Sequence, residues 1–223
     1  MIRCVIFDLD GTIYDYDSAH AAGYKSLQQY AVSHLGWAVG EFDRLYDRAM
    51  SEIEEELGRD SAAIHDRFLR FQRMMEYRGE SLSHVWPMNA AYWDTFMDSI
   101  VPYPGICDAL GWLRQNGCRT GIGTNMTVDY QLKKLEKLGL IDAFDFVVIS
   151  EETGKEKPSG GFFDRCARKA GCRPDECLFI GDDHQKDVEG ALQAGMQALW
   201  FTGKETPEEH ISDYWQLIER MKS

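Results

Sequence analysis

Polar and charged side chains follow four short segments that have the composition of β-strands. The segments span residues 2–7, 118–123, 146–149 and 177–180, and the first is an apolar run typical of a strand covered on both faces. The residues that follow them are Asp8 and Asp10, Thr124 and Asn125, Lys155 and Lys157, and Asp182, Asp183 and Asp187. Because ligands of doubly wound sheets bind beyond the carboxyl ends of the strands, we expect these side chains to lie close together.

The acidic members of this set can stay ionised together only if a cation lies between them. Carboxylate oxygens without neighbouring His or Cys ligands favour Mg²⁺. A magnesium ion with few protein ligands leaves room for phosphate oxygens, and Lys157 and Thr124 can hold the remaining ones. The residues from 124 to 127 also open a predicted helix, whose backbone N–H groups can contribute to an anion site. The set therefore predicts a magnesium-dependent site for a phosphate group.

The strands that position these residues alternate with helices in the second half of the chain. Apolar spacing predicts helices near 106–116, 128–138, 162–170 and 188–194, and a further strand at 198–201. A capping box at residues 206–209 (TPEE) predicts a terminal helix that begins there. Strands that alternate with helices pair in parallel, so we expect an α/β fold with a doubly wound parallel sheet.

Residues 18–97 have a different character, because no strand-like run interrupts them. Apolar residues recur at helical spacing in three stretches, near 42–57, 64–75 and 91–96. We therefore expect an inserted all-helical cap domain of residues 16–98. The α/β core domain would then consist of residues 1–15 and 99–223.

Composition narrows the classes of partner. The 223 residues carry a formal net charge of -13, which disfavours nucleic acid polymers and anionic membrane surfaces. No apolar run approaches the roughly 20 residues that a membrane helix needs. The six cysteines form no C-x-x-C pair, and several lie in apolar runs, as reduced core thiols do. We expect a cytoplasmic protein whose partner is a small phosphorylated molecule, and the oligomeric state stays open.

Four motifs in this order resemble those of the haloacid dehalogenase (HAD) superfamily. They are residues 8–12 (DLDGT), 124–125 (TN), 157–158 (KP) and 181–187 (GDDHQKD). The match extends over the α/β part of the chain, about two-thirds of its length. The insert between the first two motifs resembles the helical-cap (C1) subfamily. The resemblance implies a phosphatase-type hydrolase of the HAD-like fold, and its nucleotidase and N-acylneuraminate-9-phosphatase branch is one possible assignment.

The resemblance also implies roles for the acidic residues. Asp8 would be the nucleophile that attacks phosphorus, in keeping with the general use of carboxylates to split one displacement into two. Asp10 would protonate the leaving alcohol and then activate water. Asp8, the backbone carbonyl of Asp10 and Asp182 would ligate Mg²⁺. Asp187, and with it Asp183, would hold those ligands in place.

The same resemblance places Thr124, Asn125 and Lys157 around the phosphoryl group. Lys155 also fits a basic residue after the third strand, but Lys157 is preferred because a proline and a helix follow it directly. A sugar-phosphate mutase of the same fold is the alternative function, since it would use Asp8 as a phosphate shuttle. A dehalogenase is disfavoured by the presence of Asp10, which a halide leaving group does not need.

The helical segment leaves the substrate open among sugar phosphates, nucleoside monophosphates and phosphoglycolate. Arg67, Arg70 and Arg73 could meet a second anionic group on the substrate. The favoured interpretation is a solvated helix face with local ion pairs.

Overall fold

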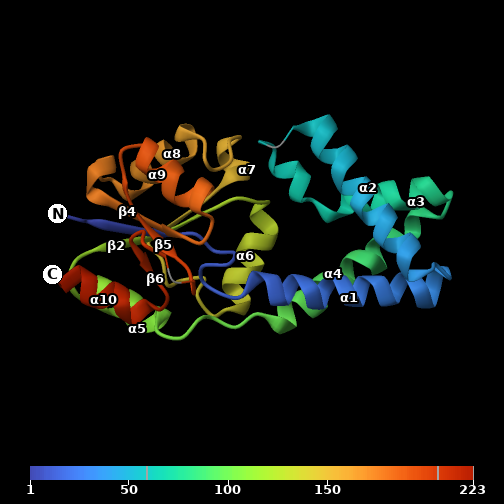
Figure 1. Ribbon diagram of the computed structural model, residues 1–223, viewed down its shortest axis with the longest axis horizontal. Coiled ribbons are helices and arrows are strands. Elements are labelled where there is room, and N and C mark those ends of the chain that lie inside the picture. Colours follow the sequence, from blue (N-terminus) through green and yellow to red (C-terminus); the bar gives the residue numbers. More distant parts are fainter. Residues whose placement is uncertain (59, 205, 223) are drawn as a thin grey trace. The chain divides into compact units, whose positions relative to one another are not determined.

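The computed structural model describes residues 1–58, 60–204 and 206–222, and the chain divides into two compact units (Figure 1). Met1–Asp15 and Val101–Ser223 form one of them, which we call the α/β unit. Tyr16–Ile100 forms the other, which we call the helical unit. None of the helices in the described part of the chain combines the length and the apolar character that crossing a bilayer requires.

The α/β unit is built on a sheet of six parallel strands in the order β3-β2-β1-β4-β5-β6. The strands are β1 (Cys4–Phe7), β2 (Arg119–Thr124), β3 (Phe146–Ile149), β4 (Cys177–Gly181), β5 (Gln197–Phe201) and β6 (His210–Ile211). The chain winds outward from β1 to β3 and then returns to β4 on the other side of β1. This reversal is the topological switch point at which doubly wound sheets bind ligands.

Helices cover both faces of this sheet, with α8 and α9 on one side and α5 and α10 on the other (Figure 1). The helical elements of the unit are α5 (Ile106–Gln115), α6 (Val128–Lys137), α7 (Ser150–Thr153), α8 (Gly160–Ala170), η3 (Pro174–Glu176), η4 (His184–Glu189), α9 (Gly190–Gln193) and α10 (Tyr214–Lys222). The predicted doubly wound α/β fold with an all-helical insertion is confirmed.

The core beneath α8 explains why the strand sequences are nearly continuous apolar runs. Ile6 and Phe179 of the central strands are buried against Phe162, Phe163 and Cys166 of α8. Burying a side chain of this size contributes roughly 1.5–3 kcal/mol, so the two phenylalanines of α8 help fix its position on the sheet. The carboxyl ends of β1 and β4 are thereby held at one edge.

The helical unit consists of four α-helices and two 3₁₀ turns in its described residues. They are α1 (Tyr16–Leu35), α2 (Val39–Leu57), η1 (Ala62–His65), α3 (Arg67–Arg78), η2 (Leu82–His84) and α4 (Val85–Ser99). The long helix α1 buries Ala19, Gly23, Leu27 and Ala31 at i, i+4 spacing, and it packs along α4. Small residues on this stripe let the large aromatic side chains of α4 lie between the helices.

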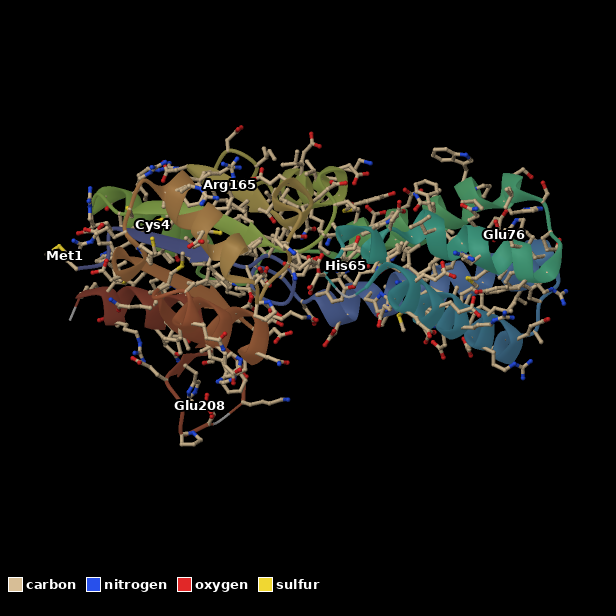
Figure 2. All side chains as sticks on the ribbon, turned by 90° about the horizontal axis from the view of Figure 1, so that it is seen from above. Met1, Cys4, His65, Glu76, Arg165 and Glu208 are labelled. Carbon is tan, nitrogen blue, oxygen red and sulfur yellow. The ribbon has the colours of Figure 1, made fainter. Side chains whose placement is uncertain are left out.

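Two local expectations are wrong. The apolar stripe near 64–75 does not lie on one helix. Asp66 caps α3 by accepting a hydrogen bond from the backbone N–H of Phe68, 2.8 Å away, and Ile64 therefore belongs to the separate turn η1. No helix begins at residue 206, because His210–Ile211 pairs with β5 as a strand and α10 begins only at Tyr214. Glu208 instead lies on the segment that leads into β6 (Figure 2).

Candidate active site

Asp8 lies at the end of β1, which pairs with β2 on one side and β4 on the other. Its backbone N–H donates to the carbonyl of Ile180, 2.8 Å away, so the sheet ladder continues up to this residue. The residue is 7% exposed. Asp8 is therefore fixed at the switch point of the sheet by the backbone itself.

The carboxylates of Asp8, Asp182 and Asp187 converge at this point. One oxygen from each lies within 4.8 Å of the others, a spacing at which all three can bind one metal ion. Asp182 follows β4, and Asp187 projects from the π-type turn η4 with only 1% exposure. The family resemblance predicts Asp182 as a ligand and Asp187 as a support, whereas both place a carboxylate oxygen within 4.8 Å of one from Asp8.

Two glycines make room for this convergence. A Cβ atom on Gly11, whose φ is +81°, would lie 2.3 Å from Oδ2 of Asp182. A Cβ atom on Gly181 would lie 2.2 Å from Oδ2 of Asp187. Both distances are far inside van der Waals contact, so any larger residue at either position would displace a carboxylate of the cluster.

Lys157 is the one lysine that touches this cluster in the described residues. Its Nζ lies 2.7 Å from Oδ1 of Asp8 and 2.7 Å from Oδ1 of Asp187, and the residue is buried. Oδ1 of Asp8 nevertheless accepts no hydrogen bond of suitable angle among the described residues. The contact of this oxygen with Lys157 is therefore an ion pair.

Electrostatics shows that one lysine does not neutralise three carboxylates. Burial raises the pKa of Asp8 to about 8, with Asp187 and Asp182 adding to the effect and Lys157 opposing it. The pKa of Asp182 is raised to about 6. The main cause is desolvation of its carboxyl group, although the residue as a whole is exposed, and the nearby Asp187 adds to the effect. A further cation at this point would offset both the burial of these carboxylates and their mutual repulsion.

The Asp10 carboxylate lies outside this cluster, in a separate set of hydrogen bonds. Nζ of Lys134 lies 2.8 Å from both of its oxygens, the Tyr14 hydroxyl donates to it, and Nε2 of Gln131 lies 3.3 Å away. Burial alone would raise the pKa of Asp10, but Lys134, Tyr14 and Gln131 together lower it below its usual range. Asp10 is therefore held as a carboxylate.

Lys134 and Gln131 are site residues that the sequence analysis missed. Both are fully buried, and they lie on α6 at positions that continue the spacing of Leu135 and Leu138 at i, i+3, i+4 and i+7. A lysine and a glutamine on the apolar stripe of an amphipathic helix are a detectable signal, because such residues are seldom buried without a partner. Leu132 of the same helix, although apolar, is exposed.

The remaining predicted residues have identifiable positions. Thr124 is buried and its hydroxyl accepts a hydrogen bond from Gln131, 2.7 Å away. The Asn125 side chain accepts from the backbone N–H of Lys157, 2.9 Å away, so it positions the lysine-bearing segment. Lys155 is exposed, in contrast to Lys157. Asp183 caps η4 by accepting from the backbone of Lys186 at 2.9 Å, apart from the carboxylate cluster.

Comparison with known proteins places this geometry in a family. The family profile of the haloacid dehalogenase-like hydrolases matches residues 2–195. The chain is 33% identical over 213 residues to the ribulose-1,5-bisphosphate 5-phosphatase of Halopiger xanaduensis, with 92% of this chain and 87% of that protein covered. It is 34% identical over 197 residues to the glyceraldehyde 3-phosphate phosphatase of Methanopyrus kandleri, with 88% and 82% covered.

A solved structure agrees with these matches. The crystal structure of a HAD phosphatase from Thermococcus onnurineus superposes with a TM-score of 0.75 and 27% identity, covering 99% of this chain and 98% of that chain. The motif segments 8–12, 124–125 and 181–187 lie at the carboxyl ends of β1, β2 and β4, and residues 157–158 follow β3 after the short helix α7. The chain therefore belongs to the haloacid dehalogenase-like hydrolases, as a member of their phosphatase type.

Proposed function

We propose that this chain is a magnesium-dependent phosphatase that hydrolyses a phosphomonoester of a small metabolite through a covalent phosphate on Asp8. The observation that carries the proposal is the convergence of Asp8, Asp182 and Asp187 around Lys157 at the switch point of the sheet. Four charged groups from three separate segments meet there, and three of them, Asp8, Lys157 and Asp187, are buried. Such an arrangement is costly for stability unless it serves a ligand.

The donor set fits a hard divalent cation. Asp8 and Asp182 supply carboxylate oxygens, and the raised pKa of both groups means that a cation would favour their ionised forms. The backbone carbonyl of Asp10 is the third expected ligand from the chain. When bound there, Mg²⁺ would offset the negative charge of the transferring phosphoryl group.

Asp8 is the proposed nucleophile because it combines burial, a place at the switch point of the sheet and an adjacent cation, Lys157. One carboxylate oxygen would form a bond to phosphorus as the bond from phosphorus to the substrate oxygen breaks, which releases the alcohol after it gains a proton. Water would then attack phosphorus, restore the Asp8 carboxylate and release inorganic phosphate. Lys157 would stabilise the charge on the phosphoryl oxygens in both steps.

Asp10 is the proposed acid and base for these two steps. Because Lys134 and Tyr14 hold it ionised, its resting form is ready to accept a proton, as the attack of water requires. It would become an acid for the leaving alcohol only after taking up a proton. Lys134 therefore acts as a positioning residue that sets the balance between the two roles.

Thr124 and Asn125 complete the proposed phosphate site in different ways. The Thr124 hydroxyl lies at the end of β2, where it would contact a phosphoryl oxygen. Asn125 would act mainly through Lys157, since its amide holds the backbone of that residue. The positively polarised start of α6 lies close in sequence and adds to the field for an anion.

The relatives support a small phosphorylated substrate. Their names refer to ribulose 1,5-bisphosphate and glyceraldehyde 3-phosphate, and both enzymes are phosphatases. We infer that this chain acts on phosphate esters of comparable size and hydrophilicity. The free thiols of its cysteines fit a cytoplasmic location.

The test is release of inorganic phosphate from a panel of phosphorylated metabolites, with Mg²⁺ and with a chelator. We expect phosphate release that requires the metal and falls by about 10³-fold or more in Asp8→Asn. Asp175→Asn, an exposed carboxylate on η3, is the matched control and should retain wild-type turnover. Metal-independent turnover, or an Asp8→Asn rate near wild type, would reject the proposal. Isomerisation without phosphate release would identify a mutase instead.

A further inference from the structure

Glu156 is a buried carboxylate of the α/β unit, and it directly precedes the lysine that contacts Asp8. The residue is 5% exposed, as Lys157 is, whereas Lys155 on its other side is exposed. Glutamate is among the residues that proteins bury least often. Because a carboxylate that leaves water must be compensated by its partners, those partners indicate what the burial serves.

Two side chains from different strand ends donate to this carboxylate. The hydroxyl of Ser150, which follows β3 and is itself buried, donates to Oε1 of Glu156 at 3.1 Å. Nδ2 of Asn125, which follows β2, lies 3.3 Å from Oε2 of the same residue. Each carboxylate oxygen is thus engaged by a different segment, so Glu156 bridges the ends of β2 and β3.

Asn125 extends this contact to the backbone of Lys157. Its Oδ1 accepts from the Lys157 backbone N–H at 2.9 Å, and its Nδ2 lies 3.3 Å from the carbonyl oxygen of the same residue. Since Oδ1 must face the N–H donor, Nδ2 is the atom that faces Glu156. The carboxylate therefore fixes the orientation of the amide that holds Lys157.

Ser150 holds the turn that follows β2. Met126 in this turn has a φ of +140°, a conformation that residues other than glycine rarely adopt. Its backbone N–H donates to Oγ of Ser150 at 3.0 Å, which leaves the serine proton for Glu156. A strained backbone conformation persists only where its surroundings hold it. Ser150 and Glu156 together supply that restraint.

We propose that Glu156 is a positioning residue that joins the turn of residues 124–126 to the segment of residues 155–157, and thereby fixes Thr124 and Lys157 for the transferring phosphoryl group. The proposal rests on the proposed phosphatase function and adds a residue to its machinery. Glu156 touches no reacting atom in this scheme and acts through the two side chains that donate to it. Misplacement of a phosphate-binding group by about 1 Å can cost roughly 100-fold in rate.

The test begins with kcat/KM for release of phosphate from p-nitrophenyl phosphate in Mg²⁺. Glu156→Leu removes both acceptor oxygens, so we expect kcat/KM to fall by about 10–100-fold. Glu156→Gln can still accept from Asn125 and donate to Ser150. The serine proton then turns to the Met126 carbonyl, 3.3 Å away, so this variant should stay within about threefold of wild type. Glu152→Leu, which replaces an exposed carboxylate of α7, is the matched control and should keep wild-type turnover.

Inhibition by orthovanadate separates positioning from a purely structural role. Its five-coordinate adduct imitates the transferring phosphoryl group, so its affinity reports how well the site is arranged for the transition state. In Glu156→Leu the inhibition constant should rise by about the same factor as kcat/KM falls. A folded Glu156→Leu variant with wild-type kcat/KM would overturn the proposal. A lower kcat/KM with an unchanged inhibition constant would also overturn it.

A smaller change covers the case in which Glu156→Leu does not fold. Ser150→Ala removes only a hydroxyl group, and it should lower kcat/KM by about fivefold or more and weaken orthovanadate to the same extent. Wild-type values of both quantities in Ser150→Ala would overturn the proposal.

Hydrogen exchange measured by NMR distinguishes failure of this proposal from failure of the proposed function, because it needs no turnover. The backbone amides of Met126 and Lys157 should exchange about tenfold faster in Glu156→Leu, or in Ser150→Ala where the former does not fold, than in wild type. Unchanged exchange at both amides would overturn the positioning role. Faster exchange in the variant, together with a wild type that releases no phosphate from any substrate, would refute the phosphatase function alone.

Discussion

Replacing Lys134 by methionine should destabilise the α/β unit, because this lysine is the only cation that the described residues place against Asp10. Lys134 is fully buried, and its Nζ lies 2.8 Å from each oxygen of Asp10. Methionine has a similar length and leaves no large cavity, so the change acts mainly on charge. The variant therefore isolates the ion pair from packing.

The size of the effect follows from the geometry. At 2.8 Å and an effective dielectric constant of about 20, the attraction between the two charges is roughly 6 kcal/mol. Desolvation of the lysine in the wild type offsets part of it, and removal of one partner from a buried pair commonly costs about 3–5 kcal/mol. The Asp10 side chain keeps 22% exposure and the Tyr14 hydrogen bond. We therefore expect a loss of about 3 kcal/mol, at the lower end of that range.

A double-mutant cycle in urea measures this interaction. The single variants Lys134→Met and Asp10→Asn are compared with the double variant, which removes both charges and should recover most of the loss. We expect a coupling free energy of about 2 kcal/mol or more. Lys133→Met, whose lysine is 58% exposed beside Asp129, is the matched control and should change the unfolding free energy by less than about 0.5 kcal/mol. Additive single effects, or a Lys134→Met variant as stable as the control, would refute this reasoning.

Three further changes test other parts of the structure. Burial lowers the pKa of His20 from 6.5 to about 4, so unfolding takes up a proton between these two pH values. When the pH falls from 6.5 to 4, wild type should therefore lose about 1–2 kcal/mol more unfolding free energy than His20→Gln does, a figure that allows for the partial exposure of the imidazole. Gly11→Ala should raise the Mg²⁺ concentration for half-maximal activity by about tenfold or more, since the new Cβ would displace Asp182. Tyr214→Phe should cost about 1 kcal/mol in urea unfolding, because its hydroxyl donates to the buried Thr12 carbonyl at 2.6 Å.

Each of these has an outcome that contradicts it. Parallel stability curves for wild type and His20→Gln from pH 7 to pH 4 would show that the imidazole is not held neutral. An unchanged Mg²⁺ requirement in Gly11→Ala would show that Asp182 is no ligand. A Tyr214→Phe variant as stable as wild type would mean that water replaces the lost donor.

The strand ends were predictable because the signal is local. The segment before Thr124 is a weaker signal, because it contains Arg119, Thr120 and two glycines, but the nearly continuous apolar run of residues 2–7 followed by Asp8 marks both the strand and its polar edge. The same holds for Asp182 after β4. Parallel pairing then brings these ends to one edge without any long-range information.

The environment of Asp10 could not be predicted in the same way. Lys134 lies 124 residues away on α6, and its burial depends on a partner that helical spacing alone does not identify. Arg67 and Arg70, which are buried rather than solvated, were misjudged for a related reason, because their aromatic partners come from other helices of the helical unit. A charged residue on a helix is exposed by default, and only tertiary contacts overturn that expectation.

The helix predicted to begin at residue 206 does not form, and the reason is the topology of the sheet. Part of the predicted capping interaction is present, since the Thr206 hydroxyl accepts a hydrogen bond from the backbone N–H of Glu208, 3.3 Å away. The edge of β5, however, offers unpaired backbone groups that His210–Ile211 satisfies as a strand. Pairing at a sheet edge thus outweighs a local helix-start signal.

The most direct test of the central claim is to locate the phosphate during turnover. Reaction of the protein with Mg²⁺ and its preferred phosphomonoester would be stopped with acid within milliseconds, and the peptides would be mapped by mass spectrometry. The mechanism predicts a transient phosphate on the Asp8 side chain whose formation and decay match phosphate release. A transient phosphate on another residue, or turnover at full rate with none on Asp8, would contradict it.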